Sequence, residues 1–212
     1  GHLFAISRFL HDSFKHMENG DFSTLKKNYG KGVELRGKTI GILGFGRIGQ
    51  SLASYALGAG MNVVPITHTE KEYEIPVFIG NGTQVTVKLQ SATMCNETLG
   101  LLDYLSIHVP KQANGSAVIG SSEFSAMKRG IRLVNAARGG VIDEQALLDA
   151  LANGTVAAAA LDVFNNEPNP DQRLISHPNI ACTPHIGAAT NEAQDRIGEE
   201  LAELIIGQFG RF

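Results

Sequence analysis

Cysteine is scarce in this sequence, which contains only Cys95 and Cys182 among 212 residues. Two cysteines are too few for a disulfide scaffold or a cysteine-based zinc site. For Cys182, an oxidation-sensitive thiol is one interpretation, but a buried strand cysteine is favoured, since free cysteine is among the most buried residue types. The histidines outside the motifs described below show no metal-ligand spacing, so no metal is expected; they are His2, His11, His16, His68 and His177.

The sequence also lacks long apolar runs and any large excess of charge of one sign. No apolar run approaches the ~20 residues that a helix needs to span a bilayer, and no signal-peptide pattern opens the chain. Its 18 basic and 21 acidic residues leave a net charge of −3. This balance gives no electrostatic reason to expect nucleic acid or an anionic membrane as a partner. We therefore expect a cytoplasmic protein with neither kind of partner.

What the sequence does contain is enough apolar material for a core. Hydrophobic residues make up 43% of the chain, which excludes wholesale disorder. Glycine is abundant, with 24 residues, so many tight turns or close backbone approaches are expected. The length suits one large domain, and we predict a single domain over residues 1–212.

After residue 37, short apolar runs alternate with helical segments. The runs carry few charges and do not alternate strictly, as is typical of strands buried on both faces of a parallel sheet. The predicted strands are 39–43, 62–66, 104–109, 131–135, 156–161 and 179–182. The predicted helices between them are 47–58, 121–129 and 143–153. This alternation predicts an α/β fold with a doubly wound parallel sheet.

The remaining segments give a less regular pattern. Apolar spacing over residues 2–19 predicts one amphipathic helix, and residues 191–206 predict a last helix that Gly207 would stop. Residues 21–37 are interpreted as an ordered loop or linker. Within 67–98, only a turn at 80–82 and a short strand at 83–89 can be recognised.

The turn after the first predicted strand has the pattern G-x-G-x-x-G over residues 44–49. Such a pattern is weak alone, and a plain tight turn is the alternative, but strand–turn–helix is the context that a dinucleotide-binding loop requires. Gly44 would permit the tight turn, Gly46 would let a pyrophosphate approach the backbone, and Gly49 would let helix and strand pack closely. Free N–H groups at the helix start would then hold the phosphates.

The acidic residue that normally follows such a loop is absent. An Asp or Glu ~20 residues on usually binds the adenosine ribose 2′-hydroxyl. Here that position falls at Thr67, so repulsion of a 2′-phosphate is weaker, and His68 or Lys71 could receive one. NAD is the expected cofactor, and NADP stays open.

Three further segments end predicted strands with chemically useful side chains. Arg138 has a planar fork that suits a carboxylate, although it could instead satisfy loop carbonyls. Asp162 could be a turn cap, and His185 alone could be structural. A His–Glu pair would tune and orient an imidazole, but spacing alone does not show that Glu167 meets His185.

Taken together, these segments resemble the nucleotide-binding domain of the D-2-hydroxyacid dehydrogenases, a Rossmann-type fold. The likeness is greatest to the D-3-phosphoglycerate dehydrogenases and covers nearly the whole chain. The matching segments, in order, are 37–49, 137–140, 161–164 with Glu167-Pro168, and 184–187 followed by 192–194.

This resemblance implies roles for individual residues. Arg138 would bind the carboxylate and carbonyl of the substrate, His185 would be the general acid/base, and Glu167 would hold His185 and keep it protonated. Asp162 would hydrogen-bond the nicotinamide carboxamide. For His108, an ordinary strand-end histidine is an equal alternative. The residues implied to contact the cofactor are Gly44, Gly46, Arg47, Ile48, Gly49, Thr67, His108, Pro110, Ala136, Ala137, Arg138, Asp162, His185 and Gly187.

The resemblance also implies what the parent protein does. It would transfer a hydride between NAD(P) and a small 2-hydroxy or 2-oxo acid, with 3-phosphoglycerate in serine biosynthesis as the implied substrate. Residues 1–20 and 191–207 resemble the helices that connect a separate substrate domain, which this chain is expected to lack, so the fragment alone should turn over little. A homodimer is expected. The alternative is a non-catalytic NAD(H)-binding or sensing module of the corepressor type.

Overall fold

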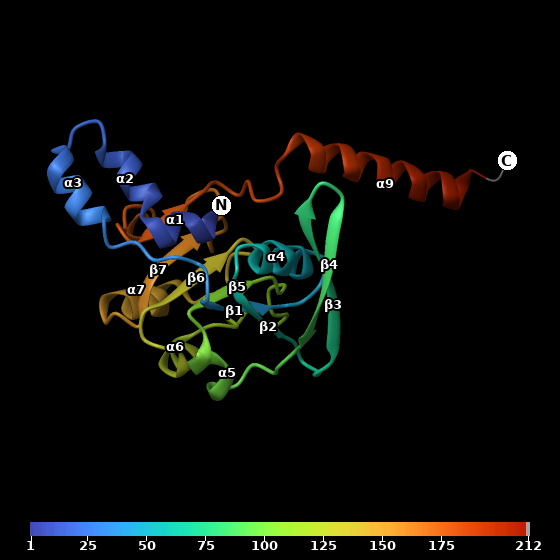
Figure 1. Ribbon diagram of the computed structural model, residues 1–212, viewed down its shortest axis with the longest axis horizontal. Coiled ribbons are helices and arrows are strands. Elements are labelled where there is room, and N and C mark those ends of the chain that lie inside the picture. The colour runs from blue at the N-terminus through green and yellow to red at the C-terminus, as the bar shows by residue number, and fades with distance from the viewer. Residues whose placement is uncertain (211–212) are drawn as a thin grey trace.

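A six-stranded parallel sheet forms the centre of the computed structural model, which describes residues 1–210 (Figure 1). Its strand order is β2-β1-β5-β6-β7-β8. The strands are β1 (Thr39–Leu43), β2 (Asn62–Ile66), β5 (Tyr104–Ile107), β6 (Ile131–Asn135), β7 (Val156–Leu161) and β8 (Ile180–Cys182). All neighbouring pairs in this sheet are parallel. The predicted doubly wound α/β fold is confirmed.

Helices cover both faces of the sheet, so its strands are buried on both sides. One face carries α1 (His2–Arg8) and α4 (Arg47–Gly58), and the other carries α5 (Asn96–Leu101), α6 (Ser121–Ala126) and α7 (Glu144–Ala152) (Figure 1). Successive residues of β7 point to opposite faces. Ala158 and Ala160 pack with Ile6 of α1, whereas Ala159 and Leu161 belong to the core on the α7 side.

The direction in which the sheet is built reverses between β1 and β5. From β1 the chain moves outward to β2, and then it returns to β5 on the other side of β1. In open α/β sheets, ligands bind outside the carboxyl ends of the strands at this reversal. The carboxyl ends of the two strands are tied together here, because the His108 backbone N–H donates to the Leu43 carbonyl at 2.7 Å.

The single N-terminal helix predicted over residues 2–19 is wrong. The helix breaks at Phe9, which has a φ of 55°, into α1 and α2 (Leu10–His16). The ring of Phe9 packs against that of Tyr29, with centroids 6.2 Å apart. Tyr29 ends α3 (Phe22–Tyr29), a helix in the segment predicted to be a loop. This tertiary contact accompanies a break that the helical periodicity does not signal.

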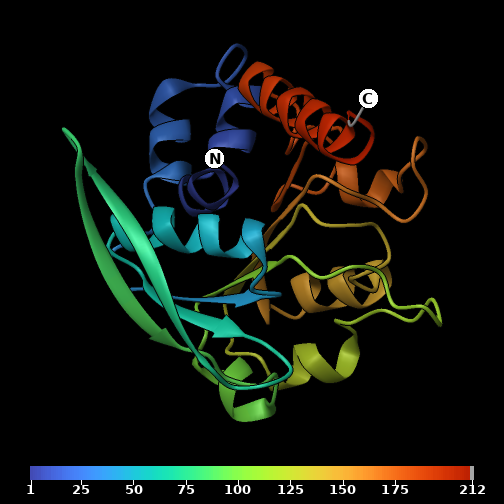
Figure 2. The same ribbon diagram turned by 90° about the vertical axis from the view of Figure 1, so that its right-hand side faces the viewer.

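Residues 72–90 form an antiparallel hairpin of two long strands, β3 (Glu72–Gly80) and β4 (Thr83–Gln90), at one edge of the molecule (Figure 2). The turn and β4 are as predicted, but β3 was missed. Pro76 interrupts its pattern, and proline within a run argues against a central strand. Ile75 of β3 is buried against the α4 side of the core. A parallel bridge between Ile66 and Ala92 follows the hairpin at the β2 edge.

The last helix, α9 (Asn191–Phe209), extends beyond its predicted end, because Gly207 does not stop it. None of its residues is buried, and it projects away from the sheet (Figure 1). The short α8 (Gln172–Ile175) was not predicted. Within the described part of the chain, no helix combines the length and apolar character that crossing a membrane requires.

Candidate active site

The glycine-rich loop joins β1 to the start of α4. Gly44 has a φ of +89°, and a Cβ there would lie 2.7 Å from the carbonyl oxygen of His108. A Cβ on Gly49 would collide with the Gly44 carbonyl oxygen and lie 3.2 Å from Cγ2 of Ile42. The turn and the close packing of helix on strand therefore both require glycine.

The same loop has the room and the donors that a pyrophosphate needs. A Cβ on Gly46 would meet nothing within 4 Å, so the backbone there faces open space. Gly46 caps α4 without a side-chain hydrogen bond, and the first turn carries no acidic residue. The unpaired N–H groups and positive dipole end of the helix are thus available to an anion. These features fit a dinucleotide phosphate group.

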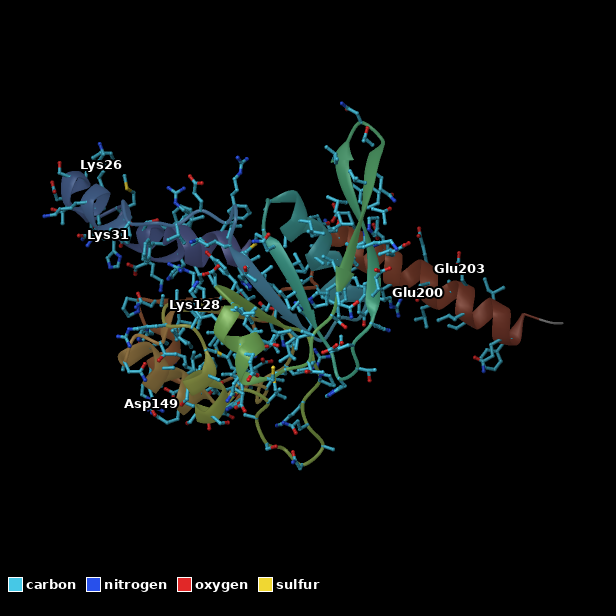
Figure 3. All side chains as sticks on the ribbon, turned by 60° about the horizontal axis from the view of Figure 1, so that its bottom comes forward. Lys26, Lys31, Lys128, Asp149, Glu200 and Glu203 are labelled. Carbon is cyan, nitrogen blue, oxygen red and sulfur yellow. The ribbon has the colours of Figure 1, made fainter. Side chains whose placement is uncertain are left out.

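Arg47 and Ile48 follow on the exposed side of the loop. The Arg47 side chain is 91% exposed, and its Nη1 lies 3.4 Å from Oε1 of Glu200 on α9, where Figure 3 labels Glu200. An exposed pair of this kind contributes little to stability, so it holds the guanidinium only weakly. Ile48 is 72% exposed.

Thr67 lies directly after β2, and its hydroxyl is used within the protein. Its Oγ1 donates to the Thr69 carbonyl at 2.9 Å and lies 3.0 Å from the Ser91 hydroxyl. Ser91, which is 2% exposed, also accepts a hydrogen bond from the Lys71 backbone N–H. Thr67 and both ends of the hairpin are therefore fastened to one another, while the neighbouring His68 side chain is exposed.

His108 follows β5 on the other side of the strand reversal. Its Nε2 lies 2.9 Å from the hydroxyl of the buried Ser106. Burial lowers the pKa of His108, so its imidazole is neutral at neutral pH. This placement serves either alternative, a strand-end histidine or one that borders a bound adenosine. Pro110 lies further along the same loop and is exposed.

The loop after β6 carries Arg138 and is shaped by the buried Asn135. The Asn135 side chain accepts from the Ala137 N–H and donates to the Arg138 carbonyl, both at 3.1 Å. The exposed Arg138 guanidinium donates to the Ala137 carbonyl at 2.6 Å. Ala136 is exposed beside it. Arg138 therefore makes one loop-carbonyl contact and remains open to solvent.

The structure brings Glu167 and His185 together. Oε2 of Glu167 lies 2.8 Å from Nδ1 of His185, and Oε1 accepts from the Phe164 backbone N–H at 2.9 Å. The hydrogen bond with His185 and the one from Phe164 lower the pKa of Glu167. An ionised carboxylate only accepts, so Nδ1 carries the proton and Nε2 remains free. The side chains of His185 and Glu167 are 52% and 37% exposed.

Asp162 lies beneath this pair and is 1% exposed. Its Oδ1 accepts from the Thr183 hydroxyl at 2.6 Å and from the Ile186 N–H at 2.9 Å, and its Oδ2 accepts from the Gly187 N–H at 2.7 Å. Burial raises the pKa of Asp162, but these hydrogen bonds outweigh it, and the net shift is downward. The carboxylate is therefore ionised and holds the loop that carries His185.

These segments converge at the carboxyl edge of the sheet. The Asp162 backbone N–H donates to the Asn135 carbonyl at 3.0 Å, which joins the ends of β6 and β7. A Cβ on Gly187 would lie 3.7 Å from that of Ala136. Sequence reasoning assigns no role to Asn135, Thr183 or His2. Thr183 adjoins the His185 motif, which was a signal that could have identified it. Nε2 of His2 lies 3.1 Å from the Thr183 hydroxyl oxygen, but no local pattern predicts a contact between residues 181 positions apart.

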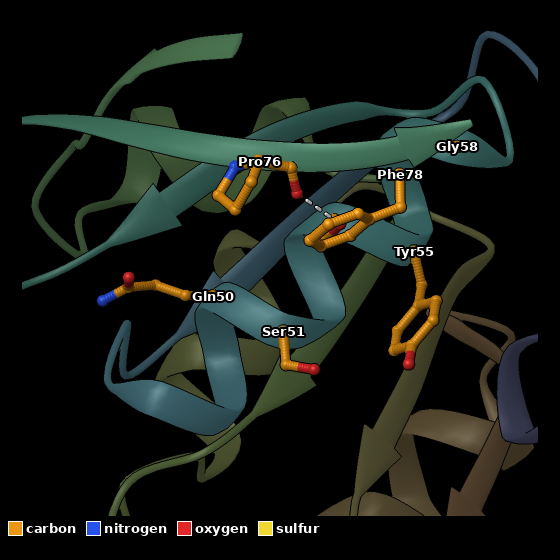
Figure 4. Close-up of a pocket in the computed structure, with 7 residues that line it drawn as sticks. Gln50, Ser51, Tyr55, Gly58, Pro76 and Phe78 are labelled. Carbon is orange, nitrogen blue, oxygen red and sulfur yellow. Dashed lines mark hydrogen bonds between the residues drawn. The ribbon is translucent and has the colours of Figure 1, made fainter. Parts of the chain in front are cut away.

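A cavity of about 440 Å³ lies away from these residues, between α4 and β3 (Figure 4). It is lined by residues of the outer side of α4, including Gln50, Ser51 and Tyr55, and by Pro76 and Phe78 of β3. The Ser54 hydroxyl donates to the Pro76 carbonyl across it at 2.6 Å. None of the predicted site residues lines this cavity. Among residues 1–210, no cluster of His, Cys, Asp and Glu suits a metal ion.

A family model and individual relatives point to the same protein family for this chain. A family model described as "D-isomer specific 2-hydroxyacid dehydrogenase, NAD binding domain" matches residues 1–187. The chain is 45% identical over 177 residues to a chloroplastic D-3-phosphoglycerate dehydrogenase of Arabidopsis thaliana, covering 83% of this chain and 28% of that protein. It is 38% identical over 213 residues to a hydroxypyruvate reductase of Thermotoga maritima, covering 99% of this chain and 64% of the relative.

Solved structures agree with this match. The holo form of a D-mandelate dehydrogenase from Rhodotorula graminis superposes with a TM-score of 0.81 at 28% identity. The alignment covers 98% of this chain and 59% of that one. The chain thus spans between 28% and 64% of the two curated relatives named above.

Proposed function

This chain belongs to the D-isomer specific 2-hydroxyacid dehydrogenase family, as its NAD-binding domain, and we propose that its parent protein transfers a hydride between NAD(P) and a D-2-hydroxy acid. The observation that carries the proposal is the hydrogen bond of 2.8 Å between Glu167 and His185. It lies at the carboxyl edge of a sheet whose glycine loop fits a pyrophosphate. The bound nicotinamide supplies the hydride acceptor or donor, and the protein supplies the proton chemistry.

His185 acts as the general acid/base through Nε2, because Nδ1 is committed to Glu167. During oxidation Nε2 takes the hydroxyl proton of the substrate, and during reduction it returns a proton to the carbonyl oxygen. Glu167 stabilises the imidazolium that exists between these events, as a carboxylate beside an imidazole does.

Arg138 binds the carboxylate of the substrate. Its exposed guanidinium retains donors beyond the one that contacts Ala137, and a planar fork pairs with a carboxylate through two hydrogen bonds. This contact fixes which end of the 2-hydroxy acid faces His185. Part of the water exclusion that hydride transfer needs must come from outside this chain, because His185 and Glu167 are both solvent-accessible here.

Replacement of His185 by Gln in the full-length protein tests this function. We expect kcat to fall by at least about a hundredfold, as is typical for loss of a general acid/base, with binding of NADH retained through the other implied contacts. Turnover at the wild-type rate would overturn the role of His185. Tight NADH binding without oxidation of any D-2-hydroxy acid by the wild type would favour the alternative, a binding or sensing module.

We propose 3-phosphoglycerate, oxidised to 3-phosphohydroxypyruvate in serine biosynthesis, as the substrate. The identity of 45% to a D-3-phosphoglycerate dehydrogenase supports this choice, and the identity of 38% to a hydroxypyruvate reductase makes hydroxypyruvate the competitor. In the direction of reduction, the two substrates are 3-phosphohydroxypyruvate and hydroxypyruvate, which differ by a phosphate group. A comparison of kcat/KM for phosphohydroxypyruvate and hydroxypyruvate decides between them, and a higher value for hydroxypyruvate would overturn the proposal.

We propose that NADH is the cofactor and that NADPH is also accepted. Thr67 stands where a carboxylate would repel a 2′-phosphate, and the exposed His68 and Lys71 offer donors nearby. Titration of the chain with both cofactors tests this, and we expect the two Kd values to agree within about tenfold, or 1.4 kcal/mol. Thr67→Asp should weaken NADPH selectively. Exclusion of NADPH by the wild-type chain would overturn the proposal.

We also propose that the parent protein is a homodimer. Support comes from large exposed apolar side chains on the projecting α9, among them Ile197, Leu201 and Leu204. Light scattering during gel filtration tests this on the full-length protein, and a monomeric mass at micromolar concentration would overturn it.

A further inference from the structure

The loop that carries His185 is held by one buried carboxylate. Asp162 accepts hydrogen bonds from Thr183, Ile186 and Gly187, three residues that flank His185 on both sides. His185 itself has a φ of 55°, which is uncommon for a residue other than glycine. Such a conformation persists where the surrounding contacts specify it. The hydrogen bonds to Asp162 are among those contacts, together with the one from the His185 N–H to the Thr183 carbonyl at 3.1 Å.

The position of this carboxylate depends in turn on Thr183. The Thr183 hydroxyl has a single proton, and it is directed to Oδ1 of the ionised Asp162 at 2.6 Å. Its remaining capacity is as an acceptor. Nε2 of His2 lies 3.1 Å from Oγ1 of Thr183, so His2 must donate the hydrogen bond to this hydroxyl oxygen. The direction of both hydrogen bonds follows from proton counting alone.

His2 belongs to α1, which packs on the sheet face formed by β6, β7 and β8. Burial lowers the pKa of His2, while the charge of Asp162 opposes that shift. The imidazole is therefore neutral near pH 7, with its one N–H on Nε2. A continuous chain of hydrogen bonds therefore runs from His2 on α1 through Thr183 to Asp162, and from Asp162 to the backbone of the loop that carries His185.

We propose that Thr183 and His2 are positioning residues for His185, and that they act by fixing the Asp162 carboxylate beneath its loop. Neither residue touches substrate or takes part in proton transfer. Their effect is on where Nε2 of His185 points relative to the substrate. The kinetic part of this inference rests on the proposed function, whereas the structural part does not.

Two matched pairs of variants test the path. Thr183→Val removes the hydroxyl at nearly constant volume, and Thr183→Ser retains it. His2→Leu removes the donor, and His2→Gln places an amide N–H where Nε2 was. Thr86→Val, on the exposed hairpin, is the remote control.

The first readout is NMR of the 212-residue chain. The Ile186 and Gly187 amide protons are expected at low field and slow to exchange, because both donate to a carboxylate. Thr183→Val should move both resonances upfield and speed their exchange at least about tenfold, while Thr183→Ser and Thr86→Val leave them in place. His2→Leu should produce the same changes to a smaller extent, and His2→Gln should not. Amides unchanged in both Thr183→Val and His2→Leu would overturn the proposal.

The second readout is steady-state kinetics of the full-length protein. Thr183→Val should lower kcat by about ten- to a hundredfold, as misplacement of a catalytic group does, with recovery in Thr183→Ser. If Thr183→Val instead caused a general loss of folding, its melting temperature would fall. If any change at this position did so, Thr183→Ser would lose activity as well. An inactive wild type would overturn the proposed function, and the NMR readout would still decide the positioning. A kcat unchanged in Thr183→Val would overturn the positioning of His185.

Discussion

Glu167 Oε2 and His185 Nδ1 lie 2.8 Å apart, although the two residues are 18 positions apart in the chain. A second oxygen of the same carboxylate accepts from the Phe164 N–H, so Glu167 cannot rotate freely. The geometry leaves Nε2 as the only ring nitrogen of His185 that can exchange a proton with a substrate.

Glu167→Gln is expected to lower kcat of the full-length protein by about ten- to a hundredfold, because the amide no longer stabilises an imidazolium. The hydrogen bond from His185 lowers the pKa of Glu167. The stabilisation from this bond is therefore present above the ordinary carboxyl pKa and is lost as pH falls through the lowered value. The ¹³C shift of the Glu167 carboxyl group follows this titration. In His185→Gln the pKa of Glu167 is expected to rise toward its ordinary value, with the Phe164 N–H still lowering it, and an unchanged pKa would contradict the assignment.

Gly46→Val is expected to abolish NADH binding, because its side chain would fill the open space in front of the backbone N–H groups of α4. Gly58→Val is the matched control, since a Cβ there also meets nothing within 4 Å but lies at the far end of the same helix. Calorimetric titration measures both. Equal binding by the two variants would show that the cofactor does not approach this loop.

Cys182 is expected to react much more slowly than Cys95 with iodoacetamide at pH 8. Burial raises the pKa of Cys182 to about 11, so its nucleophilic thiolate is scarce, whereas the Cys95 side chain is exposed. Mass spectrometry of tryptic peptides measures the two rates, and both thiols should react alike in denaturant. Faster modification of Cys182 in the folded chain would favour the oxidation-sensitive interpretation over the buried one.

Tyr29 is expected to stay protonated well above the range of an ordinary tyrosine. Burial, together with its hydrogen bond to Asp12 and the charge of that carboxylate, raises the pKa of Tyr29 to about 12. Because the folded value lies above the ordinary value of 10.0, its contribution to stability is complete below pH 10 and is lost as pH rises toward 12. Absorbance titration at about 295 nm, with Tyr29→Phe subtracted, measures the pKa. Asp12→Asn should lower it, and an ordinary value in the wild type would contradict the contact between α2 and α3.

Local pattern was sufficient for the sheet and its main helices. The runs that became β1, β2, β6 and β7 were predicted with their observed ends, because a strand buried on both faces must be apolar throughout. The loop at 44–49 could be predicted equally well, because the steric constraints that require its glycines arise largely from neighbouring residues in the chain. Asp143 caps α7, because its Oδ1 accepts a hydrogen bond from the backbone N–H of Ala146, three residues further along the chain.

Burial and backbone sterics act over short stretches of chain, so the amino-acid pattern is enough to specify the fold class, the phosphate-binding turn and the residue types available for chemistry. Which of those residues contact one another depends instead on the packing of distant elements. The break at Phe9 accompanies packing of its ring against Tyr29. The strand β3 is held against the α4 side of the core by the burial of Ile75. Glu167 reaches His185, and His2 reaches Thr183 across 181 residues. Such contacts depend on how the elements pack, and no periodicity or spacing along the chain records that packing.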